Sequence, residues 1–304
     1  MPEVVTLGEC MAVLYPQQPI ALDEATMLAL DIGGAEANLA IGLSRLGHTA
    51  RFISRVGADP FGQRIRATLA AEGVDVTYLI TDLEAPTGVF FREWLPDGAR
   101  RVYYYRAGSA ASRLRPEDLQ PEMFAGARIV HLTGITPALS TSCAAAVSRA
   151  IDLAHAAGAL VSFDPNYRPK LWDVAAARAM LLPLMERVDF LLMGHVDAQA
   201  VLGTEDDERA LERGAELGAQ VVVLKRAAHG ALALADGKRA HAPAHPVEKV
   251  IDPVGAGDGF DAGFLAGWLR GYDLEAALQL GARVGAAAVS VLGDYAGYPR
   301  EPQG

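Results

Sequence analysis

Short apolar runs alternate with longer amphipathic segments along most of this chain. The first run, Val4 to Leu7, has the length and composition of a strand, and residues 61–72 have the apolar spacing of a helix. Gly47 and Gly73 each follow a helical segment, and glycine is the usual residue just past a helix end. Strands joined through helices pair in parallel, and helices then cover both faces of the sheet. The alternation therefore predicts a three-layer α/β fold with a mostly parallel sheet between helices.

The same pattern places the individual elements. Strands are expected at 4–7, 50–56, 88–94, 101–106, 129–132, 160–163, 190–193, 221–224, 231–235 and 239–241. Helices are expected at 34–46, 61–72, 140–156, 175–186, 206–217, 256–270 and 274–291. In an open α/β sheet, ligands bind at the carboxyl ends of the strands, so the residues that follow the strands are the first candidates for a site.

One region interrupts the alternation. Two strand-like runs flank Pro96-Asp97-Gly98, a turn sequence, and both are rich in aromatic residues. They predict a small β-sheet lid, formed by parts of 11–32 and 86–107. The chain has no linker, internal repeat or low-complexity segment, so we expect a single domain over 1–304.

The composition excludes several classes of protein. The formal net charge is −10 and no Lys/Arg run is present, so we expect no nucleic-acid partner, which would require a concentrated basic face. Two cysteines in 304 residues do not make a disulfide framework. The N-terminus lacks the pattern of a signal peptide, and no apolar run has the length of a membrane span. These features predict a cytoplasmic protein with no membrane partner.

The segment from Asp252 to Asp258 carries the clearest chemical pattern. Gly255, Ala256 and Gly257 precede an expected helix, so their backbone N–H groups would converge at a helix N-terminus, where anions bind. An acid beside a phosphate is unfavourable unless it handles a proton. Asp258 is therefore a candidate general base for a hydroxyl that attacks a phosphoryl group. A helix start in which Asp258 only favours the dipole explains the loop equally well.

A second glycine pattern lies near the N-terminus. Gly33 and Gly34 precede a helix, where the absence of side chains lets the backbone approach a ligand, and Asn38 follows one turn later. The Asn38 amide suits a sugar hydroxyl, although a glycine turn with Asn38 on the helix surface explains the same residues. The chain has neither G-x-x-x-x-G-K-[ST] nor G-x-G-x-x-G after the first strand, so it is not a P-loop protein and a Rossmann dehydrogenase is not indicated.

Two arginines bear on the charge of a ligand. Arg106 ends an aromatic run on the expected lid, and Arg168 follows the expected strand at 160–163. A guanidinium in such a place suits the carboxylate of a sugar acid. The alternatives are that Arg106 is a solvated strand end and that Arg168 forms a structural ion pair.

Taken together, the two glycine patterns resemble those of a known family. Gly33-Gly34 to Asn38 is similar to the N-terminal motif of ribokinase-like carbohydrate kinases, and Asp252 to Asp258, followed by Ala262-Gly263-Phe264, is similar to their C-terminal motif. The resemblance covers nearly the whole chain. It implies a ribokinase-like fold with a β lid over the sugar, ATP as the phosphate donor, Mg²⁺ carried by the nucleotide, and a homo-oligomer (a dimer or higher). It also implies Asp258 as the base, with the anion hole at Gly255, Ala256 and Gly257.

Within that family, the stretch from Arg101 to Ala110 resembles the 2-keto-3-deoxygluconate kinases, as do 131–136 and 166–168. This resemblance implies transfer of phosphate to the 6-hydroxyl of a keto-deoxy sugar acid. The implied sugar contacts are Gly33, Gly34, Asn38, Phe90, Tyr104, Arg106, Arg168 and Asp294. The implied ATP contacts are Asn166, Arg168, Lys225, Gly230, Gly255 and Gly257, and no residue is expected to bind metal directly.

Four positions depart from the family pattern. Phe90 stands where a tyrosine is expected, which could shift the sugar preference toward the galactonate epimer. Gly194 and Ala282 each replace an expected asparagine, and Ala227 replaces the first glycine of a nucleotide loop. Two alternatives therefore stay open: a kinase of the same family for a neutral sugar or nucleoside, and a catalytically weak sugar-binding regulatory protein.

Overall fold

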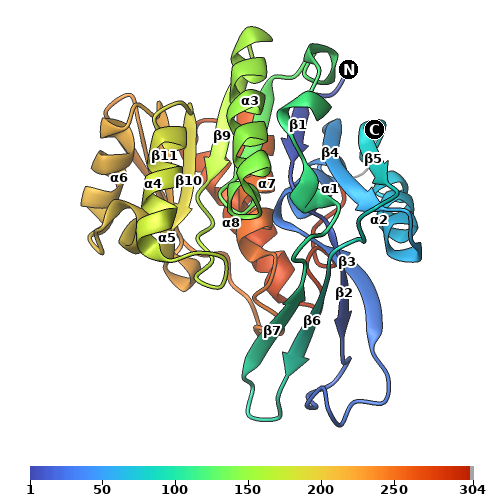
Figure 1. Ribbon diagram of the computed structural model, residues 1–304. Helices are drawn as coiled ribbons and strands as arrows, with labels where there is room; N and C mark the ends of the chain where they lie inside the picture. The colour runs from blue at the N-terminus through green and yellow to red at the C-terminus, as the bar shows by residue number, and fades with distance from the viewer. Residues whose placement is uncertain (302–304) are drawn as a thin grey trace.

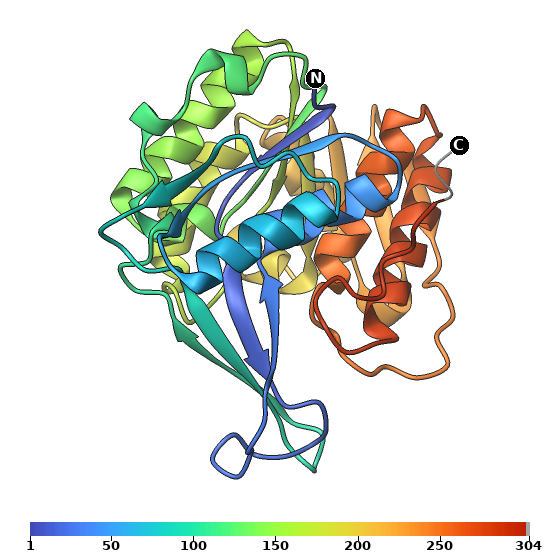
Figure 2. The ribbon, with the colours of Figure 1, turned by 90° about the vertical axis from the view of Figure 1, so that its right-hand side faces the viewer.

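A computed structural model describes residues 1–301 of the chain. Residues 302–304, which the single-domain prediction included, lie outside the described residues. In the described part, a large sheet lies between two layers of helices, and a small sheet projects from one end of this body, away from both termini (Figures 1 and 2).

The large sheet has nine strands in the order β13-β12-β11-β10-β9-β8-β1-β4-β5 over residues 1–301. Its strands are β1 (Val4–Leu7), β4 (Ala50–Gly57), β5 (Leu79–Asp82), β8 (Ile129–Thr133), β9 (Leu160–Asp164), β10 (Phe190–Gly194), β11 (Val221–Lys225), β12 (Ala231–Ala235) and β13 (Lys238–Ala242). Strand β12 runs antiparallel to β11 and β13, and the other neighbours are parallel. The predicted mostly parallel sheet is confirmed.

Helices cover both faces of this sheet. They are α1 (Ala35–Arg45), α2 (Pro60–Ala71), α3 (Thr141–Ala156), α4 (Val174–Met185), α5 (His195–Asp197), α6 (Asp207–Glu216), α7 (Ala256–Leu269) and α8 (Leu274–Val289). Short 3₁₀ turns lie at 111–113, 116–118, 121–123, 136–138 and 227–229, and a π-helical turn lies at 198–202. Helices α1, α2, α7 and α8 share one core cluster with the sheet, and α3, α4 and α6 share the other. The core is therefore two apolar layers, one on each face of the sheet. No helix in the described range is both long and apolar enough to span a bilayer.

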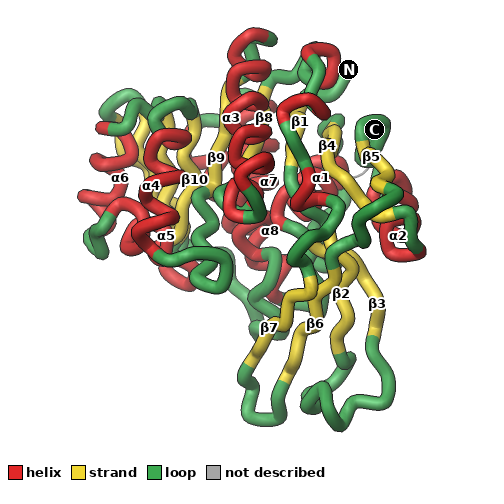
Figure 3. Tube along the Cα trace, viewed as in Figure 1, coloured by secondary structure: helices red, strands yellow, loops and turns green. Residues whose placement is uncertain are grey.

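The small sheet has four strands in the order β3-β2-β6-β7 (Figure 3). They are β2 (Met11–Tyr15), β3 (Ala29–Gly33), β6 (Val89–Trp94) and β7 (Arg100–Tyr105). Three of them fall within the expected lid segments 11–32 and 86–107, and β3 ends one residue beyond the first segment, at Gly33. Met11, Val13, Tyr15 and Phe90 form a small apolar cluster of their own on one face.

One strand of the large sheet was missed. Strand β5 has four residues, of which Leu79 and Asp82 are buried, and among residues 1–301 it pairs only with β4, at the edge of the sheet. So short a run lacks the apolar continuity that marks the central strands, and its pairing depends on where β4 lies.

Candidate active site

The helices begin in two different ways. Most of the longer ones start after an Asp or Ser whose side chain accepts a backbone N–H group of the first turn; these caps are Asp59, Ser140, Asp173, Asp206 and Asp273. Helices α1 and α7 start instead after Gly34 and Gly255, and neither has a side-chain cap. No side chain therefore competes with a ligand for the N–H groups of these two first turns, although the Ala256 N–H donates to the Pro253 carbonyl oxygen over 3.4 Å.

Asn38 and Asp258 join the two uncapped helix ends. Asn38 Nδ2 donates a hydrogen bond to Asp258 Oδ2 over 2.8 Å. Asn38 is only 2% exposed, so it does not lie on the helix surface. Its Oδ1 atom is also buried and has no hydrogen-bond partner among residues 1–301. The pair therefore combines a carboxylate held in a fixed orientation with an unused buried acceptor.

The surroundings of Asp258 favour a carboxyl that can exchange a proton. Burial raises the pKa of Asp258 above its ordinary value, while the Asn38 hydrogen bond and the positive charge of Arg168 lower it. Asp164 raises the pKa further and Lys225 lowers it. Burial is the largest of these effects and leaves the pKa raised overall, which is the direction a general base needs.

Asp294 packs against both glycine patterns. A side chain at Gly255 would collide with the Asp294 carbonyl oxygen, and a side chain at Gly33 would collide with the Asp294 carboxylate. Gly255 has φ +77°, so glycine suits the position for its conformation as well. Burial raises the pKa of Asp294 to about 6, with Arg92 acting to lower it and Asp258 to raise it. Asp294 Oδ1 lies 3.0 Å from Arg92 Nη1, with which it forms a buried ion pair.

Lys225 lies beside the predicted anion hole and forms ion pairs with two carboxylates. Its Nζ atom is 2.9 Å from Asp164 Oδ2 and 2.9 Å from Asp261 Oδ2. A methyl group added at Gly257 would lie 3.8 Å from this nitrogen. Burial acts to lower the pKa of Lys225, but the two carboxylates raise it overall. Lys225 is thus a permanent cation at the edge of the loop, held by two buried acids.

Arg168 and Asn166 follow β9. The Arg168 side chain is exposed and forms no ion pair or hydrogen bond with any residue in the described range. The structural ion pair that was its alternative explanation is absent there. Asn166 has φ +41°, and its backbone N–H donates to Asp164 Oδ1 over 2.9 Å. The positive charge of Arg168 acts to lower the pKa of Asp258.

The Arg106 side chain is 9% exposed and paired, which excludes a solvated strand end. Its Nε atom donates to Glu9 Oε2 over 2.7 Å, and the two side chains are 9% and 1% exposed. The guanidinium lies 5.5 Å from the centre of the Tyr104 ring, and Phe90 lies 5.6 Å from the same ring. The backbone oxygen of Glu9 lies so close to Gly34 that a side chain at Gly34 would collide with it. The small sheet therefore brings Phe90, Tyr104 and Arg106 next to the glycine turn.

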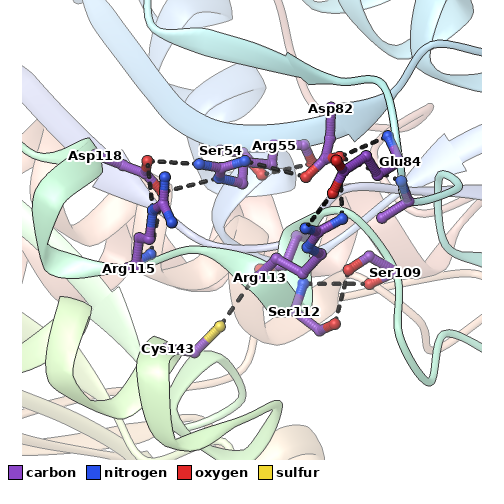
Figure 4. A network of polar contacts seen from close by, with 12 residues as sticks. Ser54, Arg55, Asp82, Glu84, Ser109, Ser112, Arg113, Arg115, Asp118 and Cys143 are labelled. Atoms are coloured by element: carbon purple, nitrogen blue, oxygen red, sulfur yellow. Dashed lines mark hydrogen bonds and ion pairs between the residues drawn. The ribbon is translucent and has the colours of Figure 1, made fainter.

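A polar network fixes the segment that follows Arg106 (Figure 4). Arg55 on β4 holds Asp118 through two hydrogen bonds of 2.8 and 2.6 Å, and it reaches Asp82 over 3.0 Å. Arg113 reaches Asp82 over 3.2 Å. Because bidentate arginine–carboxylate pairs have a fixed geometry, this network anchors the chain after the small sheet to the β4–β5 edge of the large sheet.

The expected nucleotide positions are more dispersed. Gly230 has φ +81°, and a side chain there would collide with the Ala242 carbonyl oxygen, so packing alone requires glycine. It precedes Ala231, which pairs with Lys225 across β11 and β12. Ala227, which replaces an expected glycine, has φ +48°, a conformation that alanine rarely adopts.

Several buried acids were not predicted from the sequence. Glu36 is 1% exposed, and its Oε1 atom accepts from Thr133 Oγ1 and Thr136 Oγ1, each over 2.7 Å. Burial raises its pKa to about 7. Glu9 and Asp261, described above, were also not predicted. Each has its partner in a distant segment, and a single sequence carries no signal of such pairs.

The family of the chain follows from comparison with known proteins. The sequence model of the pfkB family carbohydrate kinases matches residues 1–301. A 2-dehydro-3-deoxygluconokinase of Thermoproteus tenax is 39% identical, over 98% of this chain and 92% of that protein. A 2-dehydro-3-deoxygluconokinase of Bacillus subtilis (strain 168) is 35% identical, over 98% and 92%. A 2-dehydro-3-deoxygalactonokinase of Haloferax volcanii is 34% identical, over 97% and 93%.

Solved structures give the same result. The 2-dehydro-3-deoxygluconokinase of Thermotoga maritima superposes with a TM-score of 0.89 at 28% identity, covering 97% of this chain and 96% of that one. The fructokinase of Vibrio cholerae O395, solved with fructose, ADP and calcium ion bound, has a TM-score of 0.87 at 27% identity, covering 98% and 96%. The fold is therefore that of the ribokinase-like kinases, and the chain belongs to the pfkB family of carbohydrate kinases.

Proposed function

We propose that this kinase transfers the γ-phosphoryl group of ATP to the 6-hydroxyl of 2-keto-3-deoxygluconate, also called 2-dehydro-3-deoxygluconate. The observation that carries the proposal is the placement of Asp258 in the first turn of the uncapped helix α7, oriented by Asn38. The relatives named 2-dehydro-3-deoxygluconokinase support the choice of sugar.

The proposed chemistry needs one base and one anion site. Asp258 takes the proton of the sugar hydroxyl while the hydroxyl oxygen bonds to the γ-phosphorus. The bond between that phosphorus and the bridging oxygen of ADP breaks in the same step. The N–H groups at Gly255, Ala256 and Gly257 are then placed to stabilise the charge on the transferring group. Lys225 adds a fixed positive charge beside Gly257.

Sugar hydroxyls have suitable partners in two buried acceptors of the site. Asn38 Oδ1 has no hydrogen-bond donor among the described residues, whereas Asp294 Oδ1 is already paired with Arg92. A buried polar atom without a partner costs about 1–3 kcal/mol, which a hydroxyl donor would recover. Gly33 and Gly34 leave room beside them for the sugar backbone to approach. These acceptors support a polyol as the ligand, but they do not favour an acid over a neutral sugar.

The preference for an acid rests on Arg168 and Arg106. Arg168 is exposed, follows β9 and has no ion-pair partner among the described residues, so we assign it the sugar carboxylate, with a second contact to the nucleotide phosphates. Arg106 keeps only part of its donor capacity, because Glu9 already binds its Nε atom. Tyr104 and Phe90 complete the sugar pocket from the small sheet, which we propose acts as a lid on a single-domain enzyme.

The nucleotide would lie along 225–230 and the Gly255–Gly257 loop, with Asn166 and Arg168 at its phosphates. The described residues offer Mg²⁺ no ready ligand set: no group of three or more His, Cys, Asp or Glu side chains has a suitable arrangement. Asp197, the acid closest to the position of Gly194, already accepts two backbone N–H groups over 2.7 Å each. We therefore propose that Mg²⁺ enters with the ATP phosphates, whose charge it neutralises. Use of ATP also makes the cytoplasm the proposed location.

A second sugar has a specific observation in its favour. Phe90 is 5% exposed and lies in an apolar cluster, so it offers no hydroxyl to the sugar. Loss of one hydrogen bond near C4 would weaken discrimination between the gluconate and galactonate epimers. Activity on 2-keto-3-deoxygalactonate is therefore the second candidate, and the relative from Haloferax volcanii supports it.

The outer face of the lid suggests how subunits associate. Tyr103 and Tyr105 are 42% and 69% exposed on β7, an edge strand of the small sheet. Exposed aromatic side chains on a sheet edge are usually covered, so we propose a homo-oligomer, a dimer or higher, that buries this face. Sedimentation should give a mass of at least two chains, and Tyr105→Lys should lower it; a monomeric wild type would contradict the proposal.

Product analysis tests the proposed function. After incubation with Mg-ATP and 2-keto-3-deoxygluconate, phosphorus NMR should show one new phosphomonoester whose coupling places it at C6. An Asp258→Asn preparation is the control and should form far less of the same product. A phosphate at another carbon, or no new ester, would contradict the proposal.

A further inference from the structure

Arg92 is a buried lid residue that touches the catalytic end of the body. It lies on β6 and is 6% exposed. Its Nη1 atom is 2.8 Å from Asp252 Oδ2 and 3.0 Å from Asp294 Oδ1. The Tyr15 ring covers the guanidinium, with its centre 4.5 Å from the central carbon. One side chain thus connects the small sheet to two acids that flank helices α7 and α8.

These two acids contact the loop in which the anion hole is predicted. Asp252 begins the loop that leads to Gly255, and its carboxylate also lies 3.3 Å from the backbone N–H of Val254 and of Gly293. The carbonyl oxygen of Asp294 occupies the space directly beside Gly255, where a Cβ atom would collide with it. A movement of either acid would therefore displace the first turn of α7.

Charge balance makes the two acids dependent on Arg92. Asp252 and Asp294 are 2% and 4% exposed, and two buried carboxylates at one cation would repel each other in its absence. The other charged group of the small sheet near Asp252 is Arg100, which donates to the Ile251 carbonyl oxygen and not to either carboxylate. Arg92 is thus the cation that bridges both acids in the described part of the chain.

Two further donors of Arg92 are unused. Its Nε and Nη2 atoms are buried and have no hydrogen-bond partner among residues 1–301. An arginine that served only to hold the fold would be expected to have its donors satisfied. These donors belong to the same guanidinium whose Nη1 atom binds Asp294, so its hydrogen bonding is incomplete until a ligand or ordered water is present.

We propose that Arg92 is a positioning residue for phosphoryl transfer, which links the lid to the anion hole and to Asp294 through its two carboxylate partners. The proposal rests on the proposed phosphoryl transfer at Asp258, but not on the identity of the sugar. Lid placement and anion-hole geometry are then set together by one guanidinium.

Arg92→Ala tests this role, with free guanidinium ion as the rescuing agent. Small displacements of a reacting group can cost about 10²-fold in rate, so kcat should fall roughly 10- to 100-fold, with a smaller change in KM for ATP. Millimolar guanidinium should restore part of kcat by filling the vacated site, while urea at equal concentration should not. Arg92→Lys should have an intermediate kcat, because a lysine ammonium keeps the positive charge but cannot reproduce the geometry with which the guanidinium binds both carboxylates.

Arg209→Ala is the matched control. Arg209 is likewise held by two carboxylates, Glu212 at 3.3 Å and Glu216 at 2.8 Å, but it lies exposed on α6. Its kcat should stay within about twofold of wild type, as expected for an exposed pair. Circular dichroism melts give the folded fraction of every variant, so that a loss of activity through unfolding is separated from a loss at the site.

Several results would overturn the proposal. They are a wild-type kcat in Arg92→Ala, a loss that matches the unfolded fraction, or equal effects of guanidinium and urea. If Arg92→Ala does not fold, Arg92→Lys is tested instead, and wild-type values of kcat and KM in that variant would also overturn the proposal. The wild type is first assayed on several sugars, so failure with the keto-deoxy acid counts against that substrate alone. If no sugar reacts with the wild type, the proposed function fails and the role of Arg92 in phosphoryl transfer fails with it; with an active wild type, the kcat of Arg92→Ala tests Arg92 alone.

Discussion

Asn38 Nδ2 lies 2.8 Å from Asp258 Oδ2, which joins the first turns of α1 and α7 across 220 residues of sequence. The contact orients the carboxylate and favours its ionised form. It also connects the glycine turn before α1 to the loop before α7, so that the predicted sugar and phosphate sites are held in a fixed relative position. The first two predictions follow from this pair.

Replacement of Asp258 by asparagine removes the base and keeps the shape of the side chain. We expect kcat to fall by about 10²- to 10⁴-fold, the usual contribution of a general base, while sugar binding measured by calorimetry stays near wild type. Glu186→Gln, on the surface beyond α4, serves as a control that should keep full activity. An Asp258→Asn enzyme with most of its rate would remove Asp258 from its role.

Replacement of Asn38 by alanine should change the pH dependence of kcat. The Asn38 hydrogen bond lowers the pKa of Asp258, so its loss raises that pKa further. A base acts only when deprotonated, and the low-pH limb of the kcat profile should therefore move to higher pH. Loss of a hydrogen bond to a charged group is worth about 1.5–3 kcal/mol, so we expect a shift of roughly 1–2 pH units.

A matched variant sharpens this experiment. Asn38→Asp adds a second carboxylate beside Asp258 and should move the limb at least as far in the same direction. Glu36, Asp164, Asp294, Lys225 and Arg168 also act on this region and are unchanged in both variants. An unchanged limb in both would show that Asp258 does not control the pH dependence.

Arg168 should distinguish an acid from a neutral sugar. Arg168→Ala should raise KM for the keto-deoxy acid by about 10- to 100-fold, the value of a charge-assisted pair, and leave KM for a neutral sugar nearly unchanged. Arg168→Lys should fall between the two. Equal effects on acidic and neutral sugars would discard the assignment of the carboxylate to Arg168.

Arg106 is a less direct probe, for a physical reason. Removal of its side chain leaves Glu9 buried and unpaired, and breaking such a pair costs about 3–5 kcal/mol of stability. We therefore expect Arg106→Ala to lower the unfolding free energy as well as the sugar affinity. Urea titrations of Arg106→Ala and Arg168→Ala, compared side by side, should show a large stability loss only in the first.

Ala227 holds a conformation that glycine adopts more easily. Its φ of +48° costs an L-residue about 1–2 kcal/mol, and glycine avoids this cost while losing more backbone entropy on folding. Ala227→Gly should therefore raise the free energy of unfolding by up to about 1 kcal/mol in urea titrations. A loss of stability from this substitution would contradict the interpretation.

His131 should make the fold sensitive to acid. Burial lowers its pKa from 6.5 to about 3, and its Nδ1 atom lies 3.0 Å from Ser162 Oγ. The imidazole is thus neutral in the folded state, and its stabilising contribution, complete above pH 6.5, is lost as the pH falls from 6.5 toward 3. At pH 5 the loss is about 2 kcal/mol.

His131→Asn isolates that contribution. Acids elsewhere titrate equally in both proteins, so the difference in unfolding free energy between wild type and variant should shrink by about 2 kcal/mol between pH 7 and pH 5. A difference that is constant over this range would show that His131 is not buried neutral.

The sequence predicted the fold more fully than the contacts of the site. Apolar runs and glycine stops placed most strands and helices within one or two residues, because burial and helix termination are local signals. Strand β5 was missed because Leu79–Asp82 pairs at an edge. The glycine loops and Asp258 were visible because their residue types are unusual next to an expected helix.

The ion pairs were not visible. Glu9 with Arg106, Lys225 with Asp261, and Arg92 with Asp252 each join segments far apart in the chain, and the pattern around any one partner does not name the other. Their assignment needs the register of the small sheet and the packing of α7. Arg168 differs from these residues because it has no partner in the described part of the chain. This absence too becomes evident only once the structure places its neighbours.

A coupled ADP-release assay on the wild type tests the central claim most directly. It uses Mg-ATP with 2-keto-3-deoxygluconate, 2-keto-3-deoxygalactonate, fructose, ribose and adenosine at equal concentrations. We predict fast turnover on the two keto-deoxy acids, with a small preference between them because Phe90 offers no hydroxyl, and little turnover on the neutral compounds. Turnover on a neutral sugar that equals or exceeds that on the acids, or no turnover at all, would contradict the account.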